Sequence, residues 1–269
     1  YRGYDSAGIA TVNNSEIVCS KSTGKLISLK SKLKQKPIDG YIGIGHTRWA
    51  THGEPIEINA HPHVTKNVAV VHNGIIENFA EFKDELLEKG INFQSQTDTE
   101  VIAKLVEEKI SKEKCRPLEA VRHTVEKLRG SFALCFIFRG HENFMVATRR
   151  GSPLALGFGD GENFVSSDAL SLSIFSKKVC YLEEGDFAKL SSDEVRMYDR
   201  DGNSVSRDIH ILYTDPVNLS KGQYKHFMEK EIFEQPEVIS QVLGTYLNAF
   251  KETVSLPSLP QSTAINRII

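Results

Sequence analysis

The sequence predicts a fold of the α+β class. Three helix-like segments follow one another between residues 77 and 130, and short strand-like segments continue from residue 131 to residue 208. Helices and strands grouped in this way indicate α+β rather than a regular βαβ alternation. The length of 269 residues fits one large domain or two small ones, and 40% of the residues are apolar, which suffices for a sizeable core.

Two strands are expected before the helices. Residues 41–47 read Tyr-Ile-Gly-Ile-Gly-His-Thr, where Gly43 and Gly45 alternate with isoleucines. One face of this strand therefore has no side chains, which lets another backbone or a ligand come close. Residues 67–72 form a second short strand that is rich in valine.

Three helices are expected next. Residues 77–89 place their apolar side chains on one face, and Gly90 ends this helix. The run Thr97-Asp98-Thr99-Glu100 has the spacing of a capping box and begins the second helix. The third helix begins at Pro117 and ends at Gly130.

Strands are expected to dominate after the helices. Residues 131–138 are apolar on both faces, so this strand should lie between two layers. Residues 200–203 read Arg-Asp-Gly-Asn, a hairpin signal. Residues 226–247 read as a helix interrupted by Pro236, and 256–261 as a proline-bearing linker. Shorter strands are expected at 143–148, 163–167, 179–182, 186–191, 194–199 and 203–208.

The composition disfavours several classes of function. The net charge is −2 with no long basic run, so neither nucleic acid nor a membrane surface is an expected partner. No apolar stretch approaches the roughly 18–20 residues that span a bilayer, and the first residues do not resemble a signal peptide. The four cysteines are scattered, which fits a reducing compartment and predicts a cytoplasmic protein. Cys135, in an apolar run, is expected to be buried.

The densest group of polar residues follows the glycine-bearing strand. Arg48 can hold a carboxylate in a two-pronged grip, and Trp49 can cover a small polar ligand. Thr51 and His52 add hydrogen-bonding groups. The alternative is a loop with a structural tryptophan and an arginine that satisfies backbone carbonyls.

Two further positions have a functional and a structural interpretation. The Asn73 side-chain amide and the Gly74 N–H could together stabilise an oxyanion, or they could simply form a turn. Asp98 could bind the ammonium group of a ligand, or it could be an acid that favours a helix N-terminus.

Metal and phosphate sites are disfavoured. The histidines at 46, 52, 61, 63 and 72 do not have metal-ligand spacing, and no cysteine or carboxylate lies near them at such a spacing. Ser22-Thr23-Gly24-Lys25 lacks the remaining residues of a phosphate-binding loop, and no Gly-x-Ser-x-Gly elbow is present. No metal and no cofactor are therefore expected.

Taken together, an ordered set of motifs resembles the glucosamine-6-phosphate synthases, the isomerising glutamine–fructose-6-phosphate aminotransferases. The resemblance covers essentially the whole chain. The motifs that carry it are Tyr-Arg-Gly-Tyr-Asp-Ser-Ala-Gly (1–8), His-Thr-Arg-Trp-Ala-Thr-His-Gly (46–53), Asn-Ala-His-Pro-His (59–63), His-Asn-Gly-Ile-Ile-Glu-Asn (72–78), Thr-Asp-Thr-Glu (97–100), Arg-Gly-Ser-Pro-Leu (150–154), Ser-Ser-Asp (166–168), Leu-Glu-Glu-Gly-Asp (182–186) and Met-Glu-Lys-Glu-Ile-Phe-Glu-Gln-Pro (228–236).

The resemblance implies a four-layer αββα N-terminal-nucleophile hydrolase fold, truncated here at its N-terminus. It implies a type 2 glutamine amidotransferase domain at 1–215, a helical linker at 216–262 and the start of the first sugar-isomerase module at 263–269. In this family an N-terminal Cys attacks L-glutamine, with its own α-amino group as base, and ammonia passes through a channel to fructose 6-phosphate. The product serves amino-sugar synthesis toward UDP-N-acetylglucosamine, and the full-length protein is expected to be a homo-oligomer.

Site roles follow from the same resemblance. It implies that Arg48 binds the glutamine α-carboxylate and Asp98 the α-ammonium, while Thr51 and His52 line the glutamine site and Trp49 closes over it. Asn73 and Gly74 are then the oxyanion hole. Arg2 belongs to the motif that supports the nucleophile end of the site.

One departure from the family pattern alters the expected activity. Tyr1 stands first where the family has its cysteine, and each of the four cysteines has a peptide-bonded nitrogen. We therefore expect residues 1–269 by themselves to be inactive and less stable than the intact domain. Two alternatives remain: an amidotransferase of the same fold with another acceptor, and a non-catalytic binding module.

Overall fold

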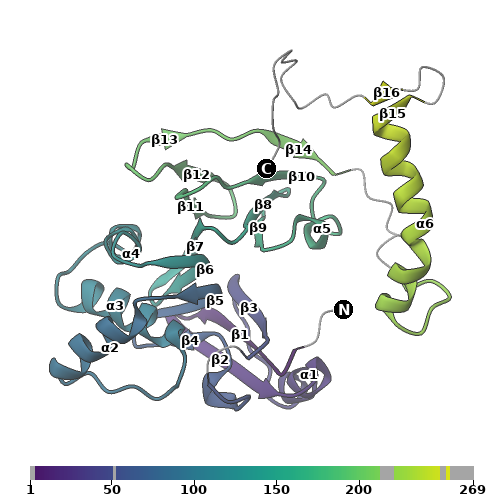
Figure 1. Ribbon diagram of the computed structural model, residues 1–269. Coiled ribbons are helices and arrows are strands. Elements are labelled where there is room, and N and C mark those ends of the chain that lie inside the picture. Colours follow the sequence, from purple (N-terminus) through teal and green to yellow (C-terminus); the bar gives the residue numbers. More distant parts are fainter. Residues whose placement is uncertain (1–3, 51–52, 213–220, 249–252, 255–269) are drawn as a thin grey trace. The chain divides into compact units, whose positions relative to one another are not determined.

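The computed structural model describes residues 4–50, 53–212, 221–248 and 253–254 (Figure 1). The chain divides into two compact units, one from Arg2 to Thr214 and one that contains Asp215–Ile269. All predicted site residues belong to the larger unit, so the two units are described separately. No helix among the described residues is long and apolar enough to cross a membrane.

A large antiparallel sheet forms the centre of the first unit. Among the described residues its strand order is β13-β12-β11-β7-β6-β5-β4. The strands are β4 (His63–Val64), β5 (Val68–Ile76), β6 (Gly130–Phe138), β7 (His141–Arg150), β11 (Phe187–Leu190), β12 (Val195–Tyr198) and β13 (Ser204–Val205). The strongly apolar β6 is therefore a central strand, as its sequence predicts.

Three helices cover one face of this sheet (Figure 1). They are α2 (Phe79–Glu88), α3 (Asp98–Ser111) and α4 (Pro117–Val125). The apolar side chains of the helices and of β5, β6 and β7 form one buried cluster. The amphipathic patterns of the three predicted helices thus bury their apolar faces against the sheet.

Two smaller antiparallel sheets make up the layer on the opposite face. The first has the order β2-β1-β3, and the second β14-β10-β8-β9. Their strands are β1 (Ser6–Asn13), β2 (Glu16–Thr23), β3 (Ile42–Arg48), β8 (Ala155–Phe158), β9 (Asn163–Ser166), β10 (Lys178–Tyr181) and β14 (Ile209–Ile211). A second buried cluster joins these strands to the large sheet.

Helices on the outside of the smaller sheets complete four layers. Helix α1 (Leu26–Gln35) packs on β2, and the short α5 (Ala169–Leu172) packs on β8 and β9. A single-turn 3₁₀ helix, η1 (Glu57–Asn59), also contacts β2. The order helix, sheet, sheet, helix is the αββα arrangement, so the predicted fold class is confirmed.

Strand β6 shows how the two inner layers pack. Phe132, Leu134 and Phe136 point to the helices, whereas Ala133 and Cys135 point to the smaller sheets. Alternate residues of a strand face opposite sides. The bulky face fills the space under the helices, and the small face lets the two sheet layers approach each other.

Several local expectations need correction. Strands β1, β2 and β8 and helix α1 are not among the predicted elements. Thr97 is the N-cap residue of α3, but its side chain does not cap the helix; its hydroxyl instead bonds His63 Nε2 at 2.9 Å. The capping box was therefore wrong, because a tertiary partner takes the hydroxyl. The hairpin at 200–203 is confirmed between β12 and β13.

The second unit contains helix α6 (Phe227–Tyr246) and the two-residue strands β15 (Leu247–Asn248) and β16 (Thr253–Val254). Pro236 lies inside α6, so the helix is continuous where the sequence predicts an interruption. The predicted linker at 256–261 lies outside the described residues.

Gly74 is required at a point where the backbone of β6 lies directly against β5. Its φ is +129°, and a Cβ placed there would lie 2.0 Å from the Ser131 carbonyl oxygen. We expect Gly74→Ala to destabilise the domain by about 3 kcal/mol or more, because strain and overlap with main chain add together. Chemical denaturation of both proteins measures the difference.

Gly161→Ala is the matched control. Gly161 also has a positive φ, +69°, but no atom lies within 4 Å of the position that a Cβ would take there. Only the backbone cost of about 1–2 kcal/mol is expected at this residue. Equal losses in the two variants would show that the contact with Ser131 contributes nothing.

Candidate functional site

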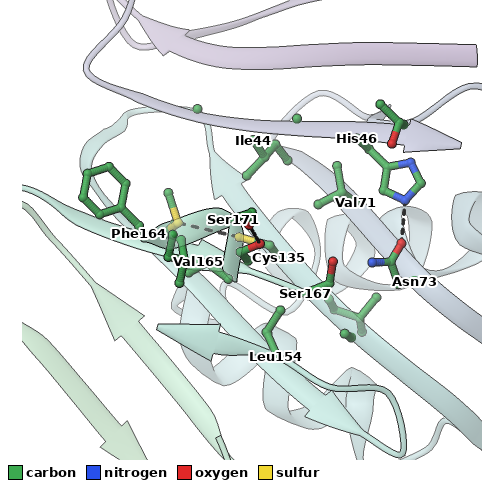
Figure 2. A pocket seen from close by; sticks show the side chains of 18 of the residues that line it. Ile44, His46, Val71, Asn73, Cys135, Leu154, Phe164, Val165, Ser167 and Ser171 are labelled. Carbon is green, nitrogen blue, oxygen red and sulfur yellow. Dashed lines mark hydrogen bonds between the residues drawn. The ribbon is translucent and has the colours of Figure 1, made fainter. Parts of the chain in front are cut away.

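A cavity of about 590 Å³ opens between the two sheet layers of the first unit. One wall is β3, including Gly43 and Gly45, and another is β9 with the Ser167 that follows it (Figure 2). Both strands lie at the edge of their own sheets. The glycine face predicted for residues 41–47 therefore borders the cavity.

Asn73 and Gly74 lie on β5, not in a turn, and Asn73 lines the cavity. Both residues are exposed. The Asn73 side-chain oxygen lies 2.7 Å from Nε2 of His46, which comes from β3 (Figure 2). The plain-turn interpretation of Asn-Gly is wrong, because this dipeptide is paired with β6 as part of the sheet.

Asp98 is the first residue of α3 and is only 6% exposed. Its Oδ2 accepts a hydrogen bond of 2.9 Å from the Ile76 N–H, just beyond Gly74. Its Oδ1 has a longer contact of 3.4 Å with the Thr99 hydroxyl, and Oδ2 is 3.9 Å from Nδ1 of His72. The carboxylate thus lies behind Asn73 and Gly74, connected to the strand that holds them.

Arg48 ends β3 and is 4% exposed. Its guanidinium donates to the carbonyls of Gly53 and Glu54, at 3.2 and 3.3 Å, and lies 3.7 Å from the Asp5 carboxylate. Asp5 also accepts a hydrogen bond from the Ala50 N–H. Trp49, which lies between Arg48 and Ala50 in the sequence, is 68% exposed.

The structure thus places Arg48 on β3, Asn73 and Gly74 on β5 and Asp98 on α3, and Trp49 directly follows β3. Three further predicted site residues, Arg2, Thr51 and His52, lie outside the described residues.

A buried network of histidines and threonines lies beside these residues. The Thr99 hydroxyl is 2.9 Å from both His61 Nε2 and His72 Nδ1. The imidazole rings of His46 and His61 lie 4.4 Å apart between centroids, and Thr97 bonds His63. Within the part of the chain that the structure describes, no group of three or more metal-ligating side chains has a geometry that could hold a metal ion.

Burial favours the neutral form of three of these histidines, His46, His61 and His63. It holds the pKa values of His61 and His63 well below the ordinary 6.5, and nearby positive groups add to the effect. Burial also lowers the pKa of His46, although its hydrogen bond to Asn73 opposes this. A charged imidazole loses more hydration than a neutral one when it is buried.

Cys135 also lines the cavity, but its chemistry is unsuited to attack. Burial raises the pKa of its thiol to about 12, so the nucleophilic thiolate is scarce near neutral pH. As predicted, the residue is buried.

Sequence reasoning gave no role to Asp5 or Thr99. Asp5 lies in the Tyr-Arg-Gly-Tyr-Asp-Ser motif, yet besides its neighbour Ser6 its carboxylate contacts Arg48 and Ala50, more than forty residues away. Thr99 lies next to Asp98, and its separation from His61 and His72 in sequence hides their contact. No local pattern identifies such a shared partner.

The neutral histidines predict a loss of stability at mildly acidic pH. In the unfolded chain they take up protons below pH 6.5, whereas in the folded domain His61 and His63 stay neutral. The unfolded state therefore binds more protons. The contribution of these histidines to the free energy of unfolding should be fully present above pH 6.5. Below pH 6.5 the free energy of unfolding should fall by up to about 1.4 kcal/mol per pH unit for each histidine.

Urea denaturation at pH 7.5, 6.5 and 5.5 measures this dependence. The glutamine amide in His63→Gln can replace the hydrogen bond to Thr97. In this variant the free energy of unfolding should fall less steeply with decreasing pH below 6.5, by the contribution of one histidine. A His63→Gln slope equal to that of the parent would contradict the prediction.

A family model described as a glutamine amidotransferase domain matches residues 46–173. The fold is similar to that of a glutamine phosphoribosylpyrophosphate amidotransferase from B. subtilis, with a TM-score of 0.62 over 75% of this chain and 44% of that one. Sequence identity to that structure is 22%, so this likeness shows the fold alone.

Two curated relatives are named glutamine–fructose-6-phosphate aminotransferase [isomerizing]. The one from Mesorhizobium japonicum is 51% identical over 96% of this chain, and the one from Bartonella quintana is 50% identical over all of it. The chain spans 42% and 44% of their respective lengths. Residues 46–173 therefore match the glutamine amidotransferase domain family, and nearly the whole chain is homologous to a segment that makes up less than half the length of each of these two relatives.

Proposed function

We propose that this domain hydrolyses L-glutamine and that the full-length protein transfers the ammonia to fructose 6-phosphate, yielding glucosamine 6-phosphate and glutamate. Relatives about 50% identical carry the corresponding name. The observation that carries the proposal is the position of Asn73 at a cavity, with Gly74 next to it on β5 and Arg48 and Asp98 on the adjacent β3 and α3. One cation, one anion and amide donors suit a zwitterionic amide substrate.

The proposed roles follow the chemistry of amide hydrolysis. A cysteine thiolate attacks the side-chain amide of glutamine, and the resulting oxyanion is stabilised by the Asn73 amide nitrogen and the Gly74 N–H. Asp98 Oδ1 is the atom that we assign to the α-ammonium, since Oδ2 accepts from Ile76. We assign the α-carboxylate to Arg48.

The remaining predicted residues are assigned to the rim of the site. Thr51 and His52 contact glutamine, Trp49 closes over it, and Arg2 supports the nucleophile end. Trp49 is exposed, which suits a side chain that moves onto a bound ligand.

We propose that the nucleophilic cysteine occupies the cavity. Its flanking strands β3 and β9 are both edge strands, which have main-chain N–H and C=O groups available for pairing. A strand that carries an N-terminal Cys could pair with them and bring its thiol to Asn73.

The domain organisation is part of the same proposal. We assign residues 1–215 to the amidotransferase domain, 216–262 to a helical linker and 263–269 to the start of a sugar-isomerase module. The boundary between compact units after Thr214 and the long helix α6 support this division. We also propose a cytoplasmic homo-oligomer, to which the four free cysteines are suited.

Asn73→Ala tests the proposed oxyanion hole in the full-length protein. We expect kcat for glutamine hydrolysis to fall about 10²–10³-fold with little change in KM, as for removal of one oxyanion donor. Glutamate and glucosamine 6-phosphate are measured with fructose 6-phosphate present. Asn203→Ala, in the exposed β12–β13 hairpin, is the control and should keep full activity.

The product identifies the acceptor. Glucosamine 6-phosphate from the unaltered full-length protein would support the proposal. Ammonia transfer to another acceptor would retain the domain assignment and replace the reaction. No glutamine hydrolysis at all would favour a non-catalytic binding module.

A further inference from the structure

His46 makes the one hydrogen bond to the Asn73 side chain that the structure describes. Its Nε2 lies 2.7 Å from Asn73 Oδ1, across the gap between β3 and β5. We propose that His46 is a positioning residue that fixes the orientation of the Asn73 amide, so that its nitrogen and not its oxygen faces the cavity. This inference rests on the proposed function, in which that nitrogen stabilises the oxyanion.

The orientation of a carboxamide depends on its partners. Its oxygen and nitrogen ends have nearly the same shape, but one accepts and the other donates. Figure 2 shows the oxygen of Asn73 directed at His46 and its nitrogen turned toward the other residues that line the cavity. In the reversed orientation the oxygen would face a developing oxyanion, and two negative centres would repel each other.

The position of one proton on His46 decides between the two orientations. With hydrogen on Nε2 the ring donates to Oδ1, which is the observed pairing. With hydrogen on Nδ1, Nε2 would become an acceptor and would bind the amide nitrogen instead. A neutral imidazole has only one such hydrogen, so its tautomer sets the direction of the amide.

The surroundings of Nδ1 favour the first tautomer. Nδ1 of His46 is buried and makes no hydrogen bond of normal geometry among the residues that the structure describes, although the backbone of His72 also lies within reach of the ring. Nε2 is thus the ring nitrogen with a well-formed side-chain partner, and a hydrogen placed there is accepted by Asn73 Oδ1. Burial also lowers the pKa of His46, which disfavours the doubly protonated ring.

Packing and pairing hold the two partners in place. The His61 ring lies 4.4 Å from the His46 ring at a tilt of 36°, and His61 is itself bonded to Thr99. The main chain of Asn73 is paired opposite Ala133 of β6. Since the main chain is fixed, rotation of the side-chain amide is the freedom that His46 removes.

Three substitutions at His46 in the full-length protein separate positioning from simple packing. His46→Gln keeps an N–H donor near the position of Nε2 and should retain at least about a third of kcat. His46→Leu removes the donor and lets both amide orientations occur, so kcat should fall roughly three- to tenfold. His46→Glu offers an acceptor, reverses the amide and should approach the roughly 10²-fold loss of Asn73→Ala.

The Michaelis constant for glutamine should change less than about twofold in all three, because the amide acts on the transition state. A structural role alone would give losses that follow the change in shape, with Glu no worse than Leu. That order, or a full loss in His46→Gln with an unchanged melting temperature, would overturn the proposal.

A double substitution distinguishes failure of this inference from failure of the proposed function. Once Asn73 is alanine, adding His46→Glu should cost less than about twofold more, because the amide that it turns is gone. Losses that multiply would mean that His46 acts elsewhere. If Asn73→Ala itself keeps full kcat, the oxyanion hole is wrongly assigned, and the proposed function fails first.

The tautomer of His46 can be observed directly in the unaltered full-length protein. Nitrogen NMR of ¹⁵N-histidine-labelled full-length protein reports which ring nitrogen carries hydrogen. We expect His46 to be neutral and protonated on Nε2, with His46→Gln used to assign its signal. Protonation on Nδ1 would overturn the inference, whatever the activities of the variants.

Discussion

The close pairing of β5 with β6 is the constraint on which the rest of the structure depends. Gly74 passes so near the Ser131 carbonyl that no side chain fits between them. The pairing holds Asn73 at the cavity and places Ile76 where its N–H reaches Asp98. A strand held this closely cannot shift its register without moving every side chain to the other face.

The same strand pair sets the spacing of the layers. On β6, bulky residues face the helices and small residues face the smaller sheets. A small face brings the two sheet layers together, and the cavity remains where β3 and β9 end their respective sheets. The site thus lies where the closely packed strands β5 and β6 meet the edge strands β3 and β9.

Polar contacts connect the first turn of α3 to the strands in front of it. Thr97 and Thr99 bond histidines, and Glu100 accepts from the backbone of Gln94 and Ser95. These bonds satisfy side chains that burial would otherwise leave unpaired. These hydrogen bonds also fix the orientation of the imidazole rings.

The sequence by itself determined the α+β class, the three helices, the two-sided burial of β6 and the family of the domain, because each depends on periodicity or on ordered motifs. It did not determine strands β1, β2 and β8, whose short patterns are completed only by pairing. Nor did it show that Thr97 bonds His63 instead of capping its helix, or that His46 faces Asn73. Those contacts join residues 27 and 34 positions apart, and only the tertiary fold brings such partners within hydrogen-bond distance.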